Sequence, residues 1–345
     1  MENRRSSVVG VVVPLEEKVP NSGVEGLVAL VAADMERVNQ TILSRTGSDV
    51  TLIPEVANHL ISSGGKRLRP MLTLATAALC GYKGEGHVKL AASVEFMHTA
   101  TLLHDDVVDG SNLRRGKTAA HLIWGAPSSV LVGDFLFARA FELMVETGQM
   151  RALGILATAS SVISEGEVLQ LTRAHDLNLD QDTYLRIISA KTAELFAAAA
   201  EAGAVGAGAD EPTVQALRAY GLNLGIAFQL ADDALDYGGA SASLGKNAGD
   251  DFQEGKATLP LLLAVARTRG REDAFWERTI TEGRRTDEDF GRARELVVGT
   301  GAIGATLDTA WDYAAAAQEA LAPLPASDWR TALEQLADFA VSRAA

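Results

Sequence analysis

Apolar residues recur at spacings of three and four along almost the whole chain. One such stripe consists of Leu27, Leu30, Val31, Met35, Val38 and Ile42. This period places apolar side chains on one face of an α-helix, whereas a β-strand would need strict alternation. No alternating segment of useful length stands out, and only 9 prolines interrupt the pattern. We therefore predict an all-α protein.

The predicted helices cover most of the chain beyond residue 23. They are expected at 24–46, 50–63, 67–82, 84–110, 127–147, 149–174, 180–203, 211–237, 256–270, 272–283, 286–298, 302–322 and 327–343. The glycine-rich breaks between them are too short to link independent domains, so residues 24–345 should form a single domain. Helices 84–110 and 211–237 are long and apolar on most faces and should be central. Residues 1–23 are predicted to be a mobile head.

Composition narrows the class of protein. The chain has 45 Asp and Glu against 31 Lys and Arg, which gives a net charge of −14, and 47% of its residues are hydrophobic. The apolar share is ordinary for a globular core, which excludes disorder throughout. The charge argues against nucleic acid as a partner, because no basic excess exists to neutralise phosphates.

Signals for a cellular compartment are few. The single cysteine, Cys80, excludes a disulfide framework and a thiolate metal cluster and fits a reducing cytoplasm. No apolar run reaches the roughly 18 residues that a membrane-spanning helix needs. We therefore expect a cytoplasmic protein without a transmembrane segment.

An acidic cluster ends the helix predicted at 84–110. Its residues are Asp105, Asp106 and Asp109. Residues four apart lie about 40° from each other around a helix, so Asp105 and Asp109 project to one side and Asp106 is turned about 100° away. Three acids at a helix C-terminus oppose the helix dipole and repel each other, so their ionisation calls for a cation.

The helix predicted at 211–237 repeats this pattern with Asp232, Asp233 and Asp236. One acidic triplet is often a solvated face, but two DDxxD patterns flanked by apolar residues indicate a lined cavity. Hard divalent cations prefer oxygen ligands, and no clustered His or Cys suits zinc. Mg²⁺ fits best, because it takes few carboxylates and is completed by substrate phosphates.

Basic residues suited to phosphates accompany the acidic motifs. The sequence GGKRLRP at 64–70 places three cations at a helix start, where exposed N–H groups favour anions. Arg114 and Arg115 follow the first acidic motif, and such a pair can grip a diphosphate bidentately. Taken singly, each basic residue would be assigned to the solvated surface.

Together these motifs resemble the trans-polyprenyl diphosphate synthases, which elongate prenyl chains. The similarity runs from about Leu27 to the C-terminus. The motifs that carry it are GGKRLRP at 64–70, DDVVD at 105–109 followed by RR at 114–115, KT at 191–192, FQLADDALD at 228–236 and GKNAGDDFQEGK at 245–256. The resemblance implies an isoprenoid synthase-type helical bundle around a central cavity, with residues 24–345 as a catalytic domain. It also implies a Mg²⁺-dependent prenyltransferase.

The resemblance assigns roles to individual residues. The expected metal ligands, for two or three Mg²⁺ ions, are Asp105, Asp109, Asp232, Asp233 and Asp236, and Asp106 supports the first pair. Isopentenyl diphosphate would be held by Lys66, Arg69, His98 and Arg115. The allylic diphosphate would be held by Arg114, Lys191, Thr192, Gln229, Lys246 and Lys256. The expected catalytic residues are Asp105, Asp106, Asp109, Arg114, Lys191 and Asp232.

The implied reaction condenses isopentenyl diphosphate with an allylic diphosphate of the farnesyl or geranylgeranyl type. Ala100 and Thr101, about one helical turn before Asp105, would line the channel for the growing product. Short-chain members of the family often carry a bulky aromatic residue there. The small residues therefore indicate a long-chain product of C40–C50, of the kind used for the ubiquinone side chain.

The sequence also allows other functions. His104 and Asp105 would suit a metal-dependent phosphohydrolase, but His121 and His175 are poor further ligands and the second DDxxD is left unexplained. A terpene cyclase shares the ionisation step but has no use for GGKRLRP. A short-chain synthase is another alternative, as is a non-catalytic subunit of a heteromeric synthase, although such subunits commonly lose an aspartate motif. The family is usually dimeric, so a homodimer is expected, with transient membrane association for product release.

Overall fold

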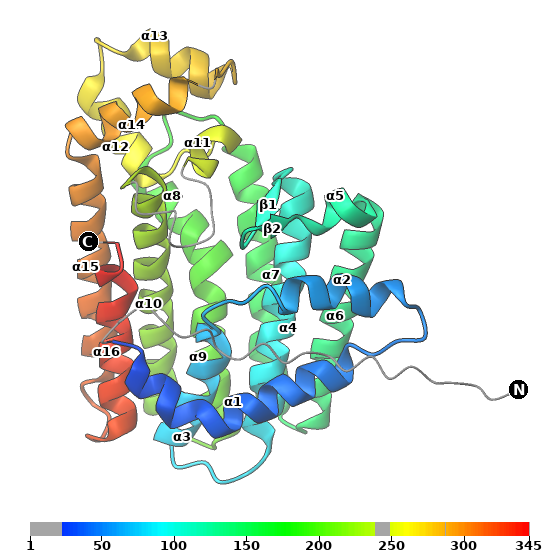
Figure 1. Ribbon diagram of the computed structural model, residues 1–345. Helices are drawn as coiled ribbons and strands as arrows, with labels where there is room; N and C mark the ends of the chain where they lie inside the picture. Colours follow the sequence, from blue (N-terminus) through cyan, green and yellow to red (C-terminus); the bar gives the residue numbers. More distant parts are fainter. Residues whose placement is uncertain (1–22, 239–248, 287, 345) are drawn as a thin grey trace, which may run out of the picture.

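The computed structural model describes residues 23–238, 249–286 and 288–344. These residues form a bundle of helices with one very short hairpin (Figure 1). The predicted all-α class is confirmed. The predicted head, apart from Gly23, and the candidate ligand Lys246 lie outside the described residues.

The α-helices in chain order are α1 (Glu25–Arg45), α2 (Leu52–Ile61), α3 (Leu68–Leu79), α4 (Gly86–Val108), α5 (Ala120–Trp124), α6 (Ala126–Glu146), α7 (Met150–Thr172), α8 (Gln181–Ile188), α9 (Glu194–Gly206), α10 (Glu211–Gly238), α11 (Asp250–Glu254), α12 (Leu259–Thr268), α13 (Asp273–Trp276), α14 (Asp289–Gly299), α15 (Ala302–Leu321) and α16 (Asp328–Ser342). Two π-helical turns are η1 (Ser189–Ala193) and η3 (Glu277–Thr281), and the antiparallel hairpin pairs β1 (Leu113–Arg114) with β2 (Lys117–Thr118).

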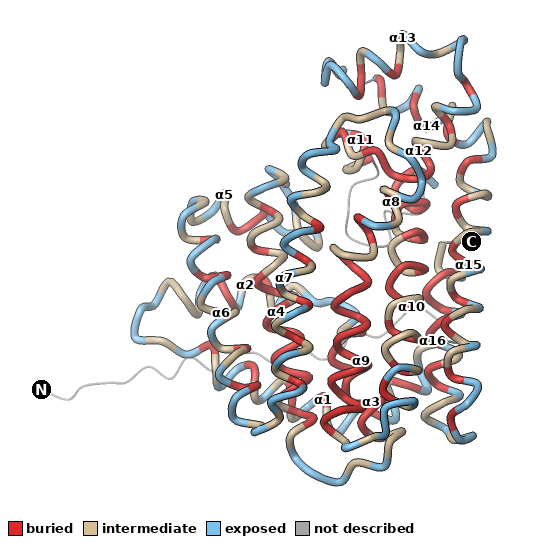
Figure 2. The backbone as a smooth tube through the Cα atoms, turned by 180° about the vertical axis from the view of Figure 1, so that it is seen from behind, coloured by how far each residue is buried: buried red, intermediate tan, exposed pale blue. Residues whose placement is uncertain are grey.

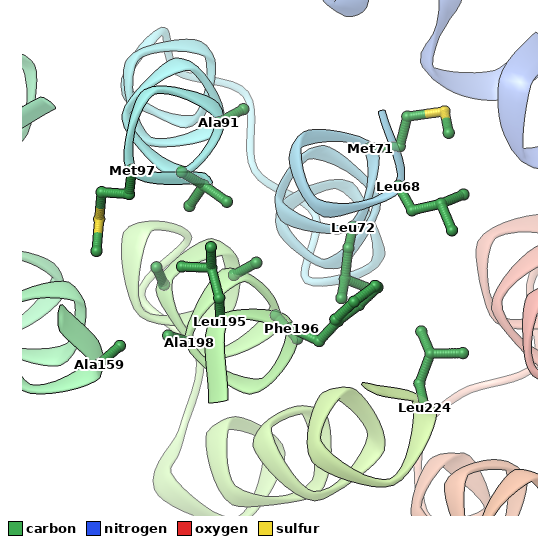
Figure 3. Packing of buried hydrophobic residues seen from close by; sticks show 14 of the residues in the cluster. Leu68, Met71, Leu72, Ala91, Met97, Ala159, Leu195, Phe196, Ala198 and Leu224 are labelled. Atoms are coloured by element: carbon green, nitrogen blue, oxygen red, sulfur yellow. The ribbon is translucent and has the colours of Figure 1, made fainter. Parts of the chain in front are cut away.

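The innermost helix is α9, in which every residue is buried (Figure 2). It packs against α3, α4, α7 and α10. Figure 3 shows Leu195 and Phe196 of α9 in a packed cluster that also contains Leu72 of α3 and Leu224 of α10. The two helices predicted to be central, α4 and α10, therefore flank the centre, and the helix between them is more deeply buried than either. On the outside of the bundle, the stripe of α1 faces the core as predicted, except for half-exposed Leu30.

The structure corrects two predicted helices and adds the short helices α5 and α11 and a hairpin. The helix predicted at 180–203 is α8, the π-helical turn η1 and α9. The helix predicted at 272–283 is α13 followed by η3. The hairpin of β1 and β2 was not expected, because its strands of two residues are too short to show an alternating pattern.

A second, smaller apolar core lies at one end of the bundle. It is built by the end of α10 and by α11 to α14, and its large buried residues include Tyr237, Phe252, Leu261, Trp276 and Ile280. Figure 1 shows these helices together above the end of α10. This core fixes the segment of residues 249–256, which crosses from the end of α10 toward the end of α4.

Among the described helices, α7 alone has the length and composition of a membrane span. Only 28% of its apolar window is buried inside the protein. The helix is not an uninterrupted apolar run, because Arg151, Glu165 and Glu167 lie within it. Exposed apolar side chains continue from α7 onto α6. The most exposed are Leu131, Val145, Met150, Val168 and Leu171.

Candidate active site

The two acidic motifs lie near the ends of α4 and α10. The segment of residues 249–256, the bridging segment, contacts both of them. Asp105 and Asp106 lie in the last turn of α4, with Asp109 as its C-cap. The second motif lies near the end of α10. After α10 the chain returns with Lys256, whose Nζ lies 2.8 Å from Oδ2 of Asp109. The structure thus brings both predicted motifs to the same end of the molecule.

The first motif concentrates negative charge in a poorly solvated place. Burial raises the pKa of the Asp105 carboxyl to about 7, and the carboxylates of Glu167 and Asp109 add to the rise, against the ammonium of Lys191. At Asp109 the effect of burial is outweighed by Lys256 and Lys191, and the pKa is lowered. Asp105 is the carboxyl in this motif that most needs a further cation.

Asp106 faces a different partner, as the helical geometry predicted. Its side chain is buried and its Oδ1 accepts a hydrogen bond of 2.7 Å from Nε of Arg114. Burial would lower the pKa of Arg114, but Asp106 outweighs burial and raises it. Asp106 therefore supports the site by fixing the guanidinium of Arg114 beside the first motif.

The three acids of the second motif have three different environments. Asp232 is the most exposed and pairs with Arg343, whose Nη1 lies 2.7 Å from Oδ1. Asp233 is 2% exposed and accepts hydrogen bonds on both oxygens. Asp236 accepts backbone N–H groups at the start of the bridging segment, from Gly249 and Asp251.

The four residues expected to hold isopentenyl diphosphate form a second group, in which Lys66, Arg69 and Arg115 are basic. Nη1 of Arg69 lies 3.2 Å from Nε2 of His98, and the guanidinium stacks on Phe196. Burial, together with the guanidinium groups of Arg69 and Arg115, lowers the pKa of His98 well below its ordinary value. A neutral His98 therefore accepts the hydrogen bond from Arg69.

Two further members complete this group. Arg115 donates to the carbonyl of Gly64, so it lies against the GGKRLRP segment. Lys66 is an exposed residue, and partial desolvation of its ammonium, together with the nearby guanidinium of Arg343, lowers its pKa to about 8. The neighbouring Arg67 has a left-handed φ of 50° and pairs with buried Glu95, which anchors the segment.

Lys191 and Thr192 lie in η1, a π-helical turn that interrupts an otherwise continuous helix. Two glycines let neighbouring helices approach it closely. A Cβ on Gly166 of α7 would lie 2.7 Å from Cβ of Ala190, and a Cβ on Gly225 of α10 would lie 2.5 Å from Cα of Ala193. Isolated π-helical turns often occur at functional sites, and here the turn presents Lys191 to the acids of α4.

The structure adds residues that the sequence motifs did not predict. Glu167 and Gln170 of α7 each lie 2.8 Å from Nζ of Lys191. Their only local signal is that two polar residues three apart share one face of a helix. Tyr184, Glu95 and Arg343 are further members, and their partners lie far away in the sequence, so no local pattern identifies them.

Other predicted residues lie apart from the acids. Nε2 of His104 lies 3.1 Å from the carbonyl of Val130 and the ring stacks on Phe137, so His104 faces α6 rather than a metal. This placement removes the basis of the phosphohydrolase alternative. Ala100 is fully buried in the core, and the hydroxyl of half-buried Thr101 donates to the carbonyl of His98.

The donor set fits Mg²⁺. All the acidic side chains offer oxygen, and Oδ2 of Asp106 is buried without a hydrogen-bond partner in the described chain. Within those residues no three His, Cys, Asp or Glu side chains form a ready-made cage. Mg²⁺ prefers oxygen ligands, keeps several waters and shares the oxygens of a substrate phosphate. The fold and the site thus define a helical protein with acidic and basic groups arranged for phosphate-bearing molecules.

Comparisons with known proteins agree with this class. A family model described as polyprenyl synthetase matches residues 50–297, and the chain belongs to that family. It is 45% identical over 314 residues to octaprenyl diphosphate synthase of Escherichia coli K12, covering 91% of this chain and 97% of the relative. It is 41% identical over 320 residues to an all-trans-nonaprenyl-diphosphate synthase (geranyl-diphosphate specific) of Rhodobacter capsulatus, covering 92% and 98%.

A solved structure extends the agreement to three dimensions. The crystal structure of a polyprenyl synthase from Caulobacter crescentus CB15, complexed with calcium and isoprenyl diphosphate, has 68% sequence identity and a TM-score of 0.92. The match covers 95% of this chain and all of that one. The predicted family is confirmed, and with it the class of enzyme: the chain is a prenyltransferase.

Proposed function

We propose that this chain is a long-chain all-trans polyprenyl diphosphate synthase that condenses isopentenyl diphosphate with an allylic diphosphate of the farnesyl or geranylgeranyl type. The observation that carries the proposal is the pairing of two acidic motifs at one end of the bundle with a separate group of cations beside them. Two diphosphates need two such places. Relatives at 41–45% identity are octaprenyl and nonaprenyl diphosphate synthases, which supports a C40–C50 product.

Different residues would bind the two substrates. The Mg²⁺ ions, two or three in number, would supply positive charge to the allylic diphosphate. They would be held by Asp105, Asp109, Asp232, Asp233 and Asp236. Arg114, Lys191, Thr192, Gln229, Lys246 and Lys256 would orient that diphosphate, and Lys66, Arg69, His98 and Arg115 would orient isopentenyl diphosphate.

The chemistry then needs no protein nucleophile. The allylic C–O bond breaks, the double bond of isopentenyl diphosphate forms the new C–C bond, and the departing diphosphate accepts the proton that is lost. The cations around both diphosphates would stabilise the charge that develops, and the reaction needs water to be kept from the allylic cation.

The exposed apolar surface indicates how the protein would assemble, and the product length indicates where the product would be used. The exposed apolar side chains of α6 and α7 support a homodimer formed through this face. The small Ala100 and Thr101 would leave the product channel open. A product of this length suits the ubiquinone side chain, made by a cytoplasmic enzyme that contacts a membrane transiently to release it.

One assay tests the reaction class. The purified chain is incubated with Mg²⁺ and farnesyl diphosphate, with or without isopentenyl diphosphate, and released diphosphate is measured. The proposal predicts release that requires both substrates. Release from farnesyl diphosphate alone would indicate a cyclase or a hydrolase, and no release without a second protein would indicate a non-catalytic subunit.

A further inference from the structure

Three residues other than glycine have a left-handed backbone in the described parts of the chain. Two of them, Arg67 and Arg115, belong to the segments that would bind isopentenyl diphosphate. The third is His175, with a φ of 66°, just beyond the end of α7. This conformation is uncommon for a residue with a Cβ and is often retained at functional sites. The contacts of His175 are therefore candidates for a functional role.

The imidazole of His175 joins the end of α7 to the π-helical turn η3. Its Nδ1 lies 2.9 Å from the carbonyl oxygen of Ile280, near the end of η3. A carbonyl oxygen only accepts hydrogen bonds, so Nδ1 carries the hydrogen in this contact. Arg285 donates to the neighbouring carbonyl of Thr279. The last carbonyls of a helix lack partners within the helix, and here His175 and Arg285 supply them.

Gly255 of the bridging segment lies between these two side chains. Its carbonyl accepts a hydrogen bond of 3.3 Å from the backbone N–H of His175. A Cβ on Gly255 would overlap the imidazole ring of His175 and would lie 3.2 Å from Nη1 of Arg285. The φ of Gly255 is 72°, a value that glycine adopts readily. The position therefore needs glycine both for its backbone and for the close approach of His175.

The residue after Gly255 is Lys256, which faces the first acidic motif. Its Nζ lies 2.8 Å from Oδ2 of Asp109 and 2.5 Å from Oε2 of Glu254. Burial would lower the pKa of Lys256, but the carboxylates of Asp109 and Glu254 outweigh burial and raise it. Oε1 of Glu254 also accepts a hydrogen bond from Ser111, just beyond α4. The place of this ammonium thus depends on how the chain is held at the preceding residue.

We infer that His175 is a positioning residue for the allylic diphosphate: its imidazole holds Gly255 beside η3 and thereby fixes where Lys256 meets the first acidic motif. This inference rests on the proposed function, because the diphosphate that Lys256 would hold is the allylic substrate. The role needs a side chain that donates to Ile280 on a left-handed backbone. Asn meets both requirements, because its amide nitrogen takes about the place of Nδ1 and Asn tolerates this conformation. Glycine meets only the second.

Two variants of His175 separate its hydrogen bond from its backbone conformation. His175→Gly keeps the conformation and removes the imidazole, and should lower kcat/KM for the allylic diphosphate about tenfold, the effect of one hydrogen bond to a charged group. His175→Asn should stay within twofold of the wild type. KM for isopentenyl diphosphate should change less than twofold in both variants, because Lys256 is not among the residues expected to hold that substrate.

Thr268→Val is the control for loss of stability in this part of the fold. The hydroxyl of Thr268 accepts a hydrogen bond of 2.9 Å from Nε1 of Trp276 in the smaller core. Thr268→Val keeps the shape of the side chain and removes that hydroxyl, so thermal stability should fall without a change in kinetics. Equal kinetics of His175→Gly and Thr268→Val would overturn the inference in favour of a purely structural histidine.

A double substitution shows whether His175 acts through Lys256. Lys256→Met removes the ammonium and lowers activity by itself. In that background, His175→Gly should lower kcat/KM for the allylic diphosphate by less than a further twofold, because two changes to one contact are not additive. A further tenfold loss would overturn the inference, since His175 would then act by another route.

Hydrogen exchange measures how the bridging segment is held, without turnover. In His175→Gly the backbone amides of residues 249–256 should exchange at least tenfold faster, whereas His175→Asn and Thr268→Val should leave their exchange within twofold of the wild type. Unchanged exchange in His175→Gly would overturn the inference. Circular dichroism verifies folding, and Gly255→Ala, whose Cβ would displace the imidazole, repeats the measurement if His175→Gly unfolds.

The proposed function and the role of His175 can fail separately. A wild-type protein that condenses no isopentenyl diphosphate contradicts the proposed function, and hydrogen exchange still tests whether His175 holds the bridging segment. An active wild type whose exchange and kinetics are unchanged by His175→Gly overturns the role of His175 alone.

Discussion

Three acidic residues at the site already have a cationic partner from the protein. Asp109 pairs with Lys256, Asp106 with Arg114, and Asp232 with Arg343. Such pairs offset the cost of burying like charges close together. A metal ion that binds Asp109 or Asp232 would free Lys256 or Arg343 to face a diphosphate. We infer that the site exchanges internal ion pairs for metal and substrate contacts when it is loaded.

Asp105 is the carboxyl of the first motif that most needs a metal ion, because burial raises its pKa to about 7. Asp105→Asn keeps its shape but removes the charge, and should lower turnover by about 10²–10³-fold, the loss typical of one electrostatic contact to a transition state. Asp134→Asn is the control, because Asp134 lies on α6 with a largely exposed side chain near His104. Near-normal diphosphate release by Asp105→Asn would remove Asp105 from the metal site.

Lys66 gives the site a pH dependence. Its pKa of about 8 means that its charge, and its attraction for a diphosphate, is present below pH 8 and lost above it. The kcat/KM for isopentenyl diphosphate, which reports ionisations of the free enzyme, should therefore fall as the pH rises through about 8. In Lys66→Arg the guanidinium stays protonated, and this decline should disappear. The same decline in both proteins would show that another group causes it.

At the residue scale, the sequence predicts the acidic motifs but not the side chains of the protein that bind to them. Asp105, Asp109 and Asp232 stand in motifs whose spacing follows from helix geometry. Arg343 lies 111 residues from Asp232, and Tyr184 lies 49 residues from Asp233. Such pairs depend on how the helices pack, and a single sequence holds no pattern for them.

At the scale of elements, two glycines of α7 differ in how closely a neighbouring segment approaches them. Gly166→Ala would press a Cβ against η1, at 3.0 Å from the backbone nitrogen of Lys191. It should destabilise the protein by about 1–3 kcal/mol and lower kcat/KM for the allylic diphosphate. Gly154→Ala on the same helix meets nothing within 4 Å and should stabilise by about 0.5–1 kcal/mol. Thermal unfolding and kinetics of both variants measure the difference, and equal behaviour would contradict the close approach.

The helical period predicts most elements but fails where burial is complete or the repeat changes. The stripe of α1 has one polar face, and its predicted boundaries of 24–46 are close to Glu25–Arg45. Every residue of α9 is buried, so no polar face marks where it begins. The π-helical turn η1 adds to the spacing within one turn, and apolar sequence on both sides conceals the change.

At the scale of the whole molecule, the apolar face of α6 and α7 makes a prediction about assembly. Leu131→Glu would place a charge on an exposed apolar side chain of this face. The mass in solution, measured by light scattering, should fall from twice the 36.4 kDa chain mass to a single chain. Val50→Glu, at an exposed apolar residue outside this face, should leave the dimer intact. A dimer that survives Leu131→Glu would contradict the proposed interface.

Product length is a second property of the whole molecule. Ala100→Phe adds a ring where α4 approaches Asp105, and should shorten the product, because a growing chain that meets the ring cannot pass it. Chain length is measured by mass spectrometry, and thermal unfolding verifies that the buried substitution is tolerated. A folded variant with an unchanged product would exclude Ala100 from the channel.

The most direct test of the proposed function is the chain length made by the unmodified protein alone. Purified protein is incubated with Mg²⁺, farnesyl diphosphate and labelled isopentenyl diphosphate, and the products are dephosphorylated and separated by length. We expect all-trans products of C40–C50. Products that stop at C20, or no product in the absence of a second protein, would contradict a self-sufficient long-chain synthase.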